Sequence, residues 1–167
     1  YPQTLTCLDP AVFDLAARKK VRLYVEFPDS LPALDVGAVK AADWERAVVA
    51  SDAFGSDLEQ LRILMIHCCQ FVDVRSDSPH LVLAKVAGFD TAAYGLPEKT
   101  ASILFEHPRG DLLVAATKLS QFVTGRYGPA GAWGAVWRWI LGWVCPNEVI
   151  PPLLWTPTVG PAYAAEK

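Results

Sequence analysis

Two adjacent cysteines, Cys68 and Cys69, follow the apolar run at residues 62–66 and are preceded by His67. A thiol at the end of a buried strand can act as a nucleophile when a neighbouring imidazole lowers its pKa. The glycines that flank the nucleophile in a strand–turn–helix elbow are missing here,. The alternative is a pair of cysteines that fill the core as small apolar side chains.

Other groups that could take part in chemistry recur where apolar runs end. A thiol nucleophile would need a base, for which His67 and His107 are the candidates, and a carboxylate to orient it, for which Glu106 and Asp52 are the candidates,. The candidates for contacts with a substrate are Glu26, Asp52, Lys118 and Arg126. Ligands of open α/β sheets bind outside the carboxyl ends of the strands, so these groups would meet at one rim. A rim without chemistry is the alternative, because polar residues are common at strand ends.

Two of these residues have a further interpretation. Arg126 could hold an anion or could equally clamp its own loop through backbone carbonyls,. His107 stands before Pro108 and Gly110, a turn context that favours a solvent-exposed loop histidine,. A metal site built from the three histidines and nearby carboxylates lacks any compact ligand motif, so the sequence predicts neither a metal nor a cofactor.

The elements that would position these groups can be read from apolar periodicity and turn residues. A helix should begin with Asp9 as its N-cap and Pro10 at its first position,. A short helix is expected at residues 38–45 with Trp44 inward, and a longer one over about 130–144,. Strands are expected at residues 4–8, 21–27, 46–51, 62–66, 80–88, 101–106 and 112–117.

This order predicts one α/β domain over residues 1–145, followed by a Pro-rich tail over residues 146–167 that packs on the domain or on a neighbour,. Several strands are nearly continuous apolar runs, as expected when both faces are covered. Few helices are apparent between residues 62 and 117, so part of the sheet should be antiparallel or hairpin-linked,.

The last helix carries an unusual number of tryptophans. Trp133 and Trp137 share one face, while Trp139 and Trp143 lie on another,. Apolar side chains therefore surround most of the helix, and one face should remain for a neighbouring domain, a second chain or the tail. The Trp133–Trp143 helix is thus the predicted partner surface.

The composition excludes other partners. The net charge is −3 and the longest basic run is Arg18-Lys19-Lys20, which is too little to neutralise the phosphates of a nucleic acid,. The longest apolar region, residues 130–144, is interrupted by Arg138 and is too short to span a bilayer,. The four cysteines show neither a zinc spacing nor a disulfide framework, so the compartment stays open,.

Several stretches resemble a known family. Residues 113–144 look like the last strand, loop and helix of class I glutamine-amidotransferase-like (ThuA-like) domains, and residues 8–28 look like a helix and strand of that superfamily. The pattern over most of residues 3–144 is similar to domains attached to bacterial carbohydrate-active proteins. Lys19-Lys20 depart from the two glycines usual in that place, and the usual first strand and helix are absent, as in part of a longer protein.

The resemblance implies a flavodoxin-like three-layer sandwich with a mainly parallel sheet. It implies no catalysis, because the Gly-x-Cys-x-Gly nucleophile motif is missing and relatives such as the trimerisation domains of β-galactosidases are non-catalytic. The first expectation is therefore a non-catalytic accessory domain of a glycan-processing protein, acting in assembly or shaping a substrate site. The alternatives are a small thiol hydrolase or amidotransferase-like enzyme using Cys68 or Cys69, and a carbohydrate-binding module.

Overall fold

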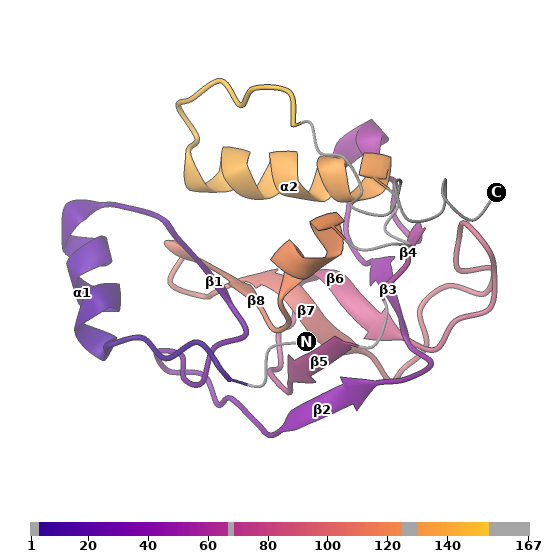
Figure 1. Ribbon diagram of the computed structural model, residues 1–167, viewed down its shortest axis with the longest axis horizontal. Helices are drawn as coiled ribbons and strands as arrows, with labels where there is room; N and C mark the ends of the chain where they lie inside the picture. The colour runs from indigo at the N-terminus through magenta and orange to yellow at the C-terminus, as the bar shows by residue number, and fades with distance from the viewer. Residues whose placement is uncertain (1–3, 67–68, 125–129, 154–167) are drawn as a thin grey trace, which may run out of the picture.

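The computed structural model describes residues 4–66, 69–124 and 130–153 of the chain, and this part is built mainly from strands (Figure 1). Two α-helices, α1 (Pro10–Lys19) and α2 (Ala130–Val144), and two short 3₁₀ helices, η1 (Gly55–Asp57) and η2 (Leu119–Thr124), accompany them. The strands are β1 (Leu23–Glu26), β2 (Val39–Ala42), β3 (Arg46–Val49), β4 (Ile63–Leu64), β5 (Cys69–Val72), β6 (Pro79–Ala84), β7 (Ala101–Glu106) and β8 (Leu112–Ala115).

Six strands form one mixed, curled sheet in the order β1-β8-β7-β6-β3-β4. Only β1 and β8 pair in parallel, and every other pair in this sheet is antiparallel. The expected flavodoxin-like three-layer sandwich with a mainly parallel sheet is therefore wrong, whereas the expected antiparallel and hairpin-linked strands are present.

Connection length explains the antiparallel pairing. Strand β8 follows β7 after the turn at residues 107–111, and a parallel neighbour would need a crossover of about a dozen residues or more,. Residues 85–100, which join β6 to β7, contain no helix that could cover the sheet. The long apolar runs are buried by one helix on each face, α1 and α2, and by the second sheet, rather than by a full layer of helices on both faces.

The second sheet consists of β2 and β5, paired antiparallel with Val39 opposite Val72 and Ala42 opposite Cys69. The short helix expected at residues 38–45 is wrong, because this stretch is strand β2 and the turn after it. The Trp44 side chain is exposed rather than inward. Strand β5 was not predicted from the sequence. The stretch after the expected strand at residues 62–66 was interpreted as a loop, and β5 begins there, at Cys69.

Helix α1 forms as its sequence predicts. The Asp9 carboxylate accepts a hydrogen bond from the Ala11 N–H, which satisfies a free donor at the helix start, and Pro10 occupies the first position,. Lys20 ends the helix in the left-handed region at φ 55°. Phe13 and Ala16 are buried, and Phe13 joins a core with residues of β1 and β8.

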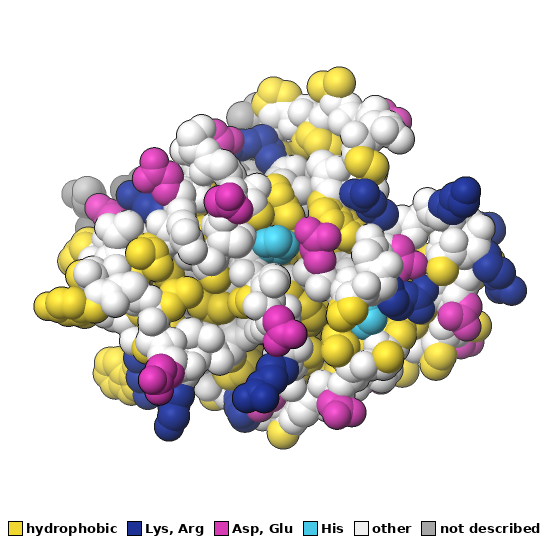
Figure 2. Space-filling model, turned by 180° about the vertical axis from the view of Figure 1, so that it is seen from behind, with side chains coloured by type: hydrophobic (Ala, Val, Ile, Leu, Met, Phe, Trp, Pro, Cys, Tyr) yellow, Lys and Arg dark blue, Asp and Glu magenta, His cyan; other side chains and the backbone are white. Residues whose placement is uncertain are grey.

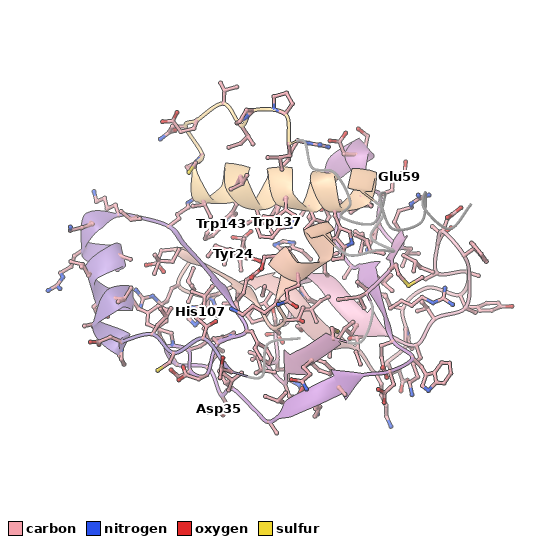
Figure 3. All side chains as sticks on the ribbon, in the orientation of Figure 1. Tyr24, Asp35, Glu59, His107, Trp137 and Trp143 are labelled. Atoms are coloured by element: carbon pink, nitrogen blue, oxygen red, sulfur yellow. The ribbon has the colours of Figure 1, made fainter. Side chains whose placement is uncertain are left out.

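Helix α2 covers the opposite face of the sheet, where Trp133, Val136 and Ile140 are buried in the main core. The other tryptophans also pack within this chain: the Trp137 ring meets Tyr24 edge-on with centroids 5.7 Å apart, and the Arg22 guanidinium lies 4.9 Å from the Trp143 centroid (Figure 3). Much of the apolar surface of α2 is thus used by its own sheet, and a partner on this helix stays a prediction.

The Pro-rich tail begins directly after α2, and residues 146–152 are mostly exposed. Residues 154–167 lie outside the described part of the chain, so packing of the tail also stays a prediction. None of the helices in the described ranges is long and apolar enough to cross a membrane.

Candidate active site

The polar groups that were expected at one rim lie at two opposite edges of the sheet. Glu26 is the last residue of β1 and Lys118 follows β8, and because these two strands are parallel, both residues lie at the same end of the sheet. Strands β3 and β7 run the other way, which places Asp52 and Glu106 at the far edge. One pocket collecting all of these groups is therefore impossible in this topology.

At the first edge, hydrogen bonds occupy the Glu26 carboxylate. One oxygen accepts bonds from the Tyr24 hydroxyl (2.8 Å) and from the Ser120 N–H (2.8 Å), and the other accepts the Ser120 hydroxyl (2.6 Å). Glu26 thus caps the start of η2. Lys118 donates a 2.8 Å hydrogen bond to the Thr6 hydroxyl, which ties the N-terminal segment to β8. This cluster holds elements together.

At the opposite edge, a serine, a histidine and a carboxylate meet. Ser51 follows β3, His80 lies near the start of β6, and Glu106 ends β7. The Ser51 Oγ lies 2.9 Å from the His80 Nδ1, and the His80 Nε2 lies 3.4 Å from the Glu106 Oε1. Three adjacent antiparallel strands therefore supply a hydroxyl, an imidazole and a carboxylate in sequence.

An irregularity in β6 and an aromatic contact set the position of the imidazole. The register between β6 and β7 shifts between Pro79 and Leu81, at His80, and such a bulge re-aims a side chain,. The His80 ring packs against Trp139 of α2 at a centroid distance of 4.6 Å, and Phe54 lies beside both rings. Helix α2 thus fixes the imidazole as well as the core.

The tautomer of His80 that fits its neighbours carries the proton on Nε2, because the ionised Glu106 carboxylate facing Nε2 can only accept,. With that tautomer the Ser51 hydroxyl donates to the His80 Nδ1 while its oxygen accepts the Ala53 N–H at 3.3 Å. The ring proton then sits on Nε2, facing the Glu106 carboxylate. Burial lowers the pKa of His80 below its ordinary 6.5, although the charges of Glu106 and Asp52 oppose the shift,. His80 is therefore a neutral imidazole at neutral pH, the form that acts as a base.

One atom of this group is left without a hydrogen bond. The His80 Nε2 is buried and makes none within the described part of the chain, because its 3.4 Å contact with Glu106 does not have hydrogen-bond geometry. The Glu106 side chain is 44% exposed, against 14% for His80, so the carboxylate can rotate onto Nε2 at small cost. A charge appearing on the imidazole would draw it there.

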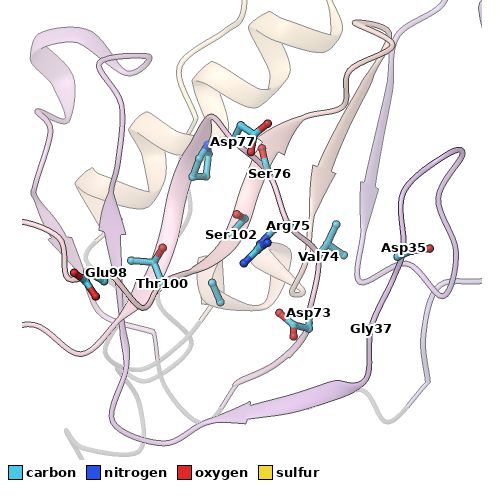
Figure 4. Close-up of a pocket in the computed structure, with 12 residues that line it drawn as sticks. Asp35, Gly37, Asp73, Val74, Arg75, Ser76, Asp77, Glu98, Thr100 and Ser102 are labelled. Carbon is cyan, nitrogen blue, oxygen red and sulfur yellow. The ribbon is translucent and has the colours of Figure 1, made fainter.

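The group opens onto hollows in the surface. Ser51 and His80 line one of about 460 Å³, and Glu106 lines a neighbouring one of about 430 Å³. A third, of about 730 Å³, shares Asp77 with both (Figure 4). Figure 2 shows histidine side chains in cyan within the far side of the molecule, with acidic side chains in magenta close by. A ligand lying along the segment 75–79 would reach the serine.

The cysteine and histidine candidates of the sequence lie elsewhere. Cys69 is buried in β5 and pairs across the ladder with Ala42, while His67, Cys68 and Arg126 fall outside the described residues. Cys7 is exposed, and its hydrogen bond to Asp29 raises its pKa, which makes it a poor nucleophile,. The described ranges contain no cluster of three or more His, Cys, Asp or Glu that could hold a metal.

His107 is buried, and the expectation of a solvent-exposed loop histidine is wrong. Its Nε2 lies 2.7 Å from the Pro32 carbonyl oxygen, to which it donates, and its Nδ1 accepts the Arg109 N–H at 3.2 Å. Both ring nitrogens thus bind backbone and pin the β7–β8 turn to the loop after β1. This histidine has no nitrogen left to serve as a base.

Sequence reasoning considered Glu106 and Asp52 but missed Ser51 as a nucleophile and named His80 only as a conceivable metal ligand. Their positions offered one signal. Ser51 ends an apolar run, and His80 begins the next long one, so an antiparallel pairing of the two runs would have placed them together,.

Comparison of the chain with protein-family models, curated proteins and solved structures found no match.

Proposed function

We propose that this chain hydrolyses an ester or amide, with Ser51 as the nucleophile, His80 as the general base and Glu106 as the carboxylate that stabilises the imidazolium. The 2.9 Å contact between the Ser51 Oγ and the His80 Nδ1, with a carboxylate at the other ring nitrogen, carries the proposal,. Serine, histidine and carboxylate groups of this kind are recognised by geometry and roles rather than by sequence position.

The chemistry follows from the protonation states. The Ser51 Oγ attacks the carbonyl carbon while its proton passes to the His80 Nδ1,. The imidazolium, whose Nε2–H faces Glu106, then gives the proton to the leaving group, and an ester on Ser51 remains. Water attacks this ester with His80 again as the base, which releases the acid and restores the serine. The two ring nitrogens have exchanged roles relative to the usual arrangement, without change in the proton balance.

This proposal keeps the reaction class of the thiol-hydrolase hypothesis but changes the nucleophile. A hydroxyl is a weaker nucleophile than a thiolate and needs a base within hydrogen-bond reach. Ser51 has such a base in contact. Cys69 is enclosed in the main core, to which β5 contributes it.

Covalent labelling tests the proposal directly. An alkyl fluorophosphonate should add to the full-length protein at Ser51, as shown by intact mass and peptide mapping. Ser51→Ala should abolish the label and reduce hydrolysis of p-nitrophenyl acetate by about a thousandfold or more. Ser78→Ala is the matched control, because Ser78 lines the same hollow as Ser51 and lies outside the serine–histidine–carboxylate group. Equal labelling of the wild type and Ser51→Ala would refute the proposal.

A carbohydrate-binding accessory role in a glycan-processing protein is the second candidate, favoured by three exposed aromatic side chains. Trp44, Phe89 and Tyr94 are 81%, 95% and 91% exposed, and aromatic rings at a protein surface can pack on the apolar faces of sugars. A soluble oligosaccharide should then shift the tryptophan fluorescence in a saturable way, and Trp44→Ala should remove that shift. Silence across a broad panel of glycans would exclude this role.

A further inference from the structure

The largest of the three hollows, about 730 Å³, lies between the two sheets (Figure 4). Residues 73–77 after β5, residues 98–102 leading into β7, and Asp35 and Gly37 before β2 form its walls. Gly37 permits the close approach of two walls: its N–H donates to the Asp73 carbonyl oxygen at 2.9 Å, and a Cβ at this position would lie 2.9 Å from the same oxygen. The hollow is thus a built feature of the packing of the two sheets.

Arg75 lines this hollow and is paired with none of the carboxylates around it. Those carboxylates belong to Asp35, Asp73, Asp77 and Glu98. Asp73 is bound by Lys40 at 2.5 Å, and within the described residues no salt bridge or hydrogen bond engages the Arg75 guanidinium. A guanidinium offers five donors in a planar fork that matches a carboxylate. Arg75 therefore presents an unused anion-binding group.

Ser102 supplies an independent sign of a ligand. It is only 8% exposed, it lines the hollow, and its hydroxyl makes no hydrogen bond among the residues that the structure describes. The Ser102 oxygen is not fully buried, so it opens onto the hollow and can donate to a ligand there or accept from one,. Figure 4 shows Ser102 and Arg75 towards the middle of the hollow, with Asp35 and Glu98 at its two ends. Donors at the centre and carboxylates at the periphery suit a ligand with both charges.

We propose that this hollow binds an amino acid or short peptide, with its carboxylate held by Arg75 and Ser102 and its ammonium group facing the unpaired carboxylates of Asp35, Asp77 or Glu98. This proposal names the substrate class of the proposed hydrolysis. Its claim that the bound peptide is a substrate rests on that proposed function. The hollow shares Asp77, Pro79 and Thr100 with the one that Ser51 lines, so a longer ligand extends from Arg75 towards the nucleophile. A peptide-like substrate with a free carboxylate fits this path.

Calorimetric titration of the full chain carrying Ser51→Ala tests binding without turnover. The dipeptide Ala-Ala should bind, whereas its C-terminal amide and its N-acetyl derivative should each bind at least tenfold more weakly. In the same background Arg75→Gln should weaken Ala-Ala at least tenfold, and Ser102→Ala severalfold. Arg62→Gln, on the wall of a separate hollow, is the matched control and should leave the affinity unchanged.

Three results would overturn the inference: no binding of Ala-Ala at millimolar concentration, equal binding of the acid and the amide, or equal weakening by Arg62→Gln and Arg75→Gln. Fluorophosphonate labelling separates this failure from failure of the proposed function. A protein that labels at Ser51 but ignores the dipeptides keeps the hydrolase proposal and loses this one. A protein that binds Ala-Ala through Arg75 but never labels keeps this inference as a binding site and loses the hydrolase.

Discussion

The two polar clusters at opposite edges of the sheet differ in how completely their hydrogen bonds are made. The Glu26 carboxylate accepts three hydrogen bonds from Tyr24 and Ser120, and the two from Ser120 join β1 to η2. His80 uses one nitrogen on Ser51, while its other nitrogen is buried without a hydrogen bond and lies 3.4 Å from a rotatable carboxylate. All the hydrogen bonds of the first cluster are made in the structure. In the second cluster the Nε2 of His80 gains its bond to Glu106 only when the imidazole becomes charged and draws the carboxylate towards it.

This difference separates stabilising groups from reactive groups. A buried donor left unsatisfied costs about 1–3 kcal/mol, so each one calls for an explanation, and at His80 the facing serine and carboxylate offer a chemical one,. Replacements in the Glu26 cluster should therefore change stability without changing the reaction. Replacements around His80 should change the reaction far more than they change stability.

The largest effect is expected at His80. His80→Asn removes the base and should slow acylation by about a thousandfold, within the usual range for general-base catalysis. The unfolding free energy should fall by no more than about 1–3 kcal/mol, because the variant loses the Nδ1 contact with Ser51 and the ring packing on Trp139 but no hydrogen bond at Nε2,. Stopped-flow measurement of p-nitrophenyl acetate hydrolysis, beside urea denaturation, checks both expectations.

His107→Asn is the control for that variant. Both nitrogens of His107 bind backbone, so its replacement should lower the unfolding free energy by about 1–3 kcal/mol and leave the rate nearly unchanged,. If His80→Asn kept a rate within tenfold of the wild type, or His107→Asn lost the reaction while folded, the comparison of the clusters would break.

The second effect is expected at Glu26. Glu26→Ala leaves the Ser120 N–H and the Tyr24 hydroxyl without their acceptor and should lower the unfolding free energy by about 1–3 kcal/mol,. The acylation rate should stay within about twofold, because this carboxylate lies at the other edge of the sheet. Urea denaturation and the esterase assay measure the two quantities. A rate that falls with intact stability would make Glu26 part of the chemistry.

Much of the local structure could be predicted, because its causes are local. Asp9-Pro10 starts α1, and the apolar runs of β1, β3, β6, β7 and β8 lie within the expected ranges or begin a residue before them. The sheet topology could not be predicted, since apolar runs look the same in a parallel sheet covered by helices and in a curled antiparallel one. Strand β2 was taken for a helix because its pairing partner β5 went unrecognised.

The same error of topology made the prediction of the site wrong. Assuming parallel strands placed Glu26, Asp52, Glu106 and Lys118 at one rim, whereas antiparallel strands bring the end of one run to the start of the next. Ser51 and His80 meet for this reason. Such a meeting depends on strand order and on the bulge in β6, and neither leaves a mark in the types or spacing of the residues. A chemical group assembled across strands is thus harder to foresee than a motif within one.

The third effect concerns pH. Hydrolysis requires neutral His80, so the rate should fall on acidification with a midpoint below 6.5, since burial lowers the pKa of His80,. Glu106→Gln removes the larger of the two neighbouring charges that raise this pKa, so the midpoint should move further down,. A pH–rate profile of kcat/KM measures both. A midpoint that rises in Glu106→Gln would show that the carboxylate does not face the titrating group.

Stability should follow the same titration with a predictable sign. His80 has a lower pKa in the folded than in the unfolded protein, so the unfolded chain binds the proton more readily,. The contribution of neutral His80 is therefore complete above about pH 6.5 and is lost as the pH falls from there towards the folded pKa. Urea denaturation of the wild type against His80→Asn over this interval isolates the contribution of this residue.

The smallest effect is expected at Asp52, the weaker of the two charges that raise the pKa of His80. Asp52→Asn should lower the midpoint of the pH–rate profile in the same direction as Glu106→Gln but by less, because the neighbouring carboxylate remains. Asp57→Asn is the matched control: that aspartate pairs with Arg138 of α2 and should leave the midpoint in place while removing a surface ion pair of small stability,. An equal shift of the midpoint in Asp52→Asn and Asp57→Asn would reflect the net charge of the protein alone. The carboxylates beside His80 would then not tune its pKa, and the contrast with the fully hydrogen-bonded Glu26 carboxylate would lose its electrostatic part.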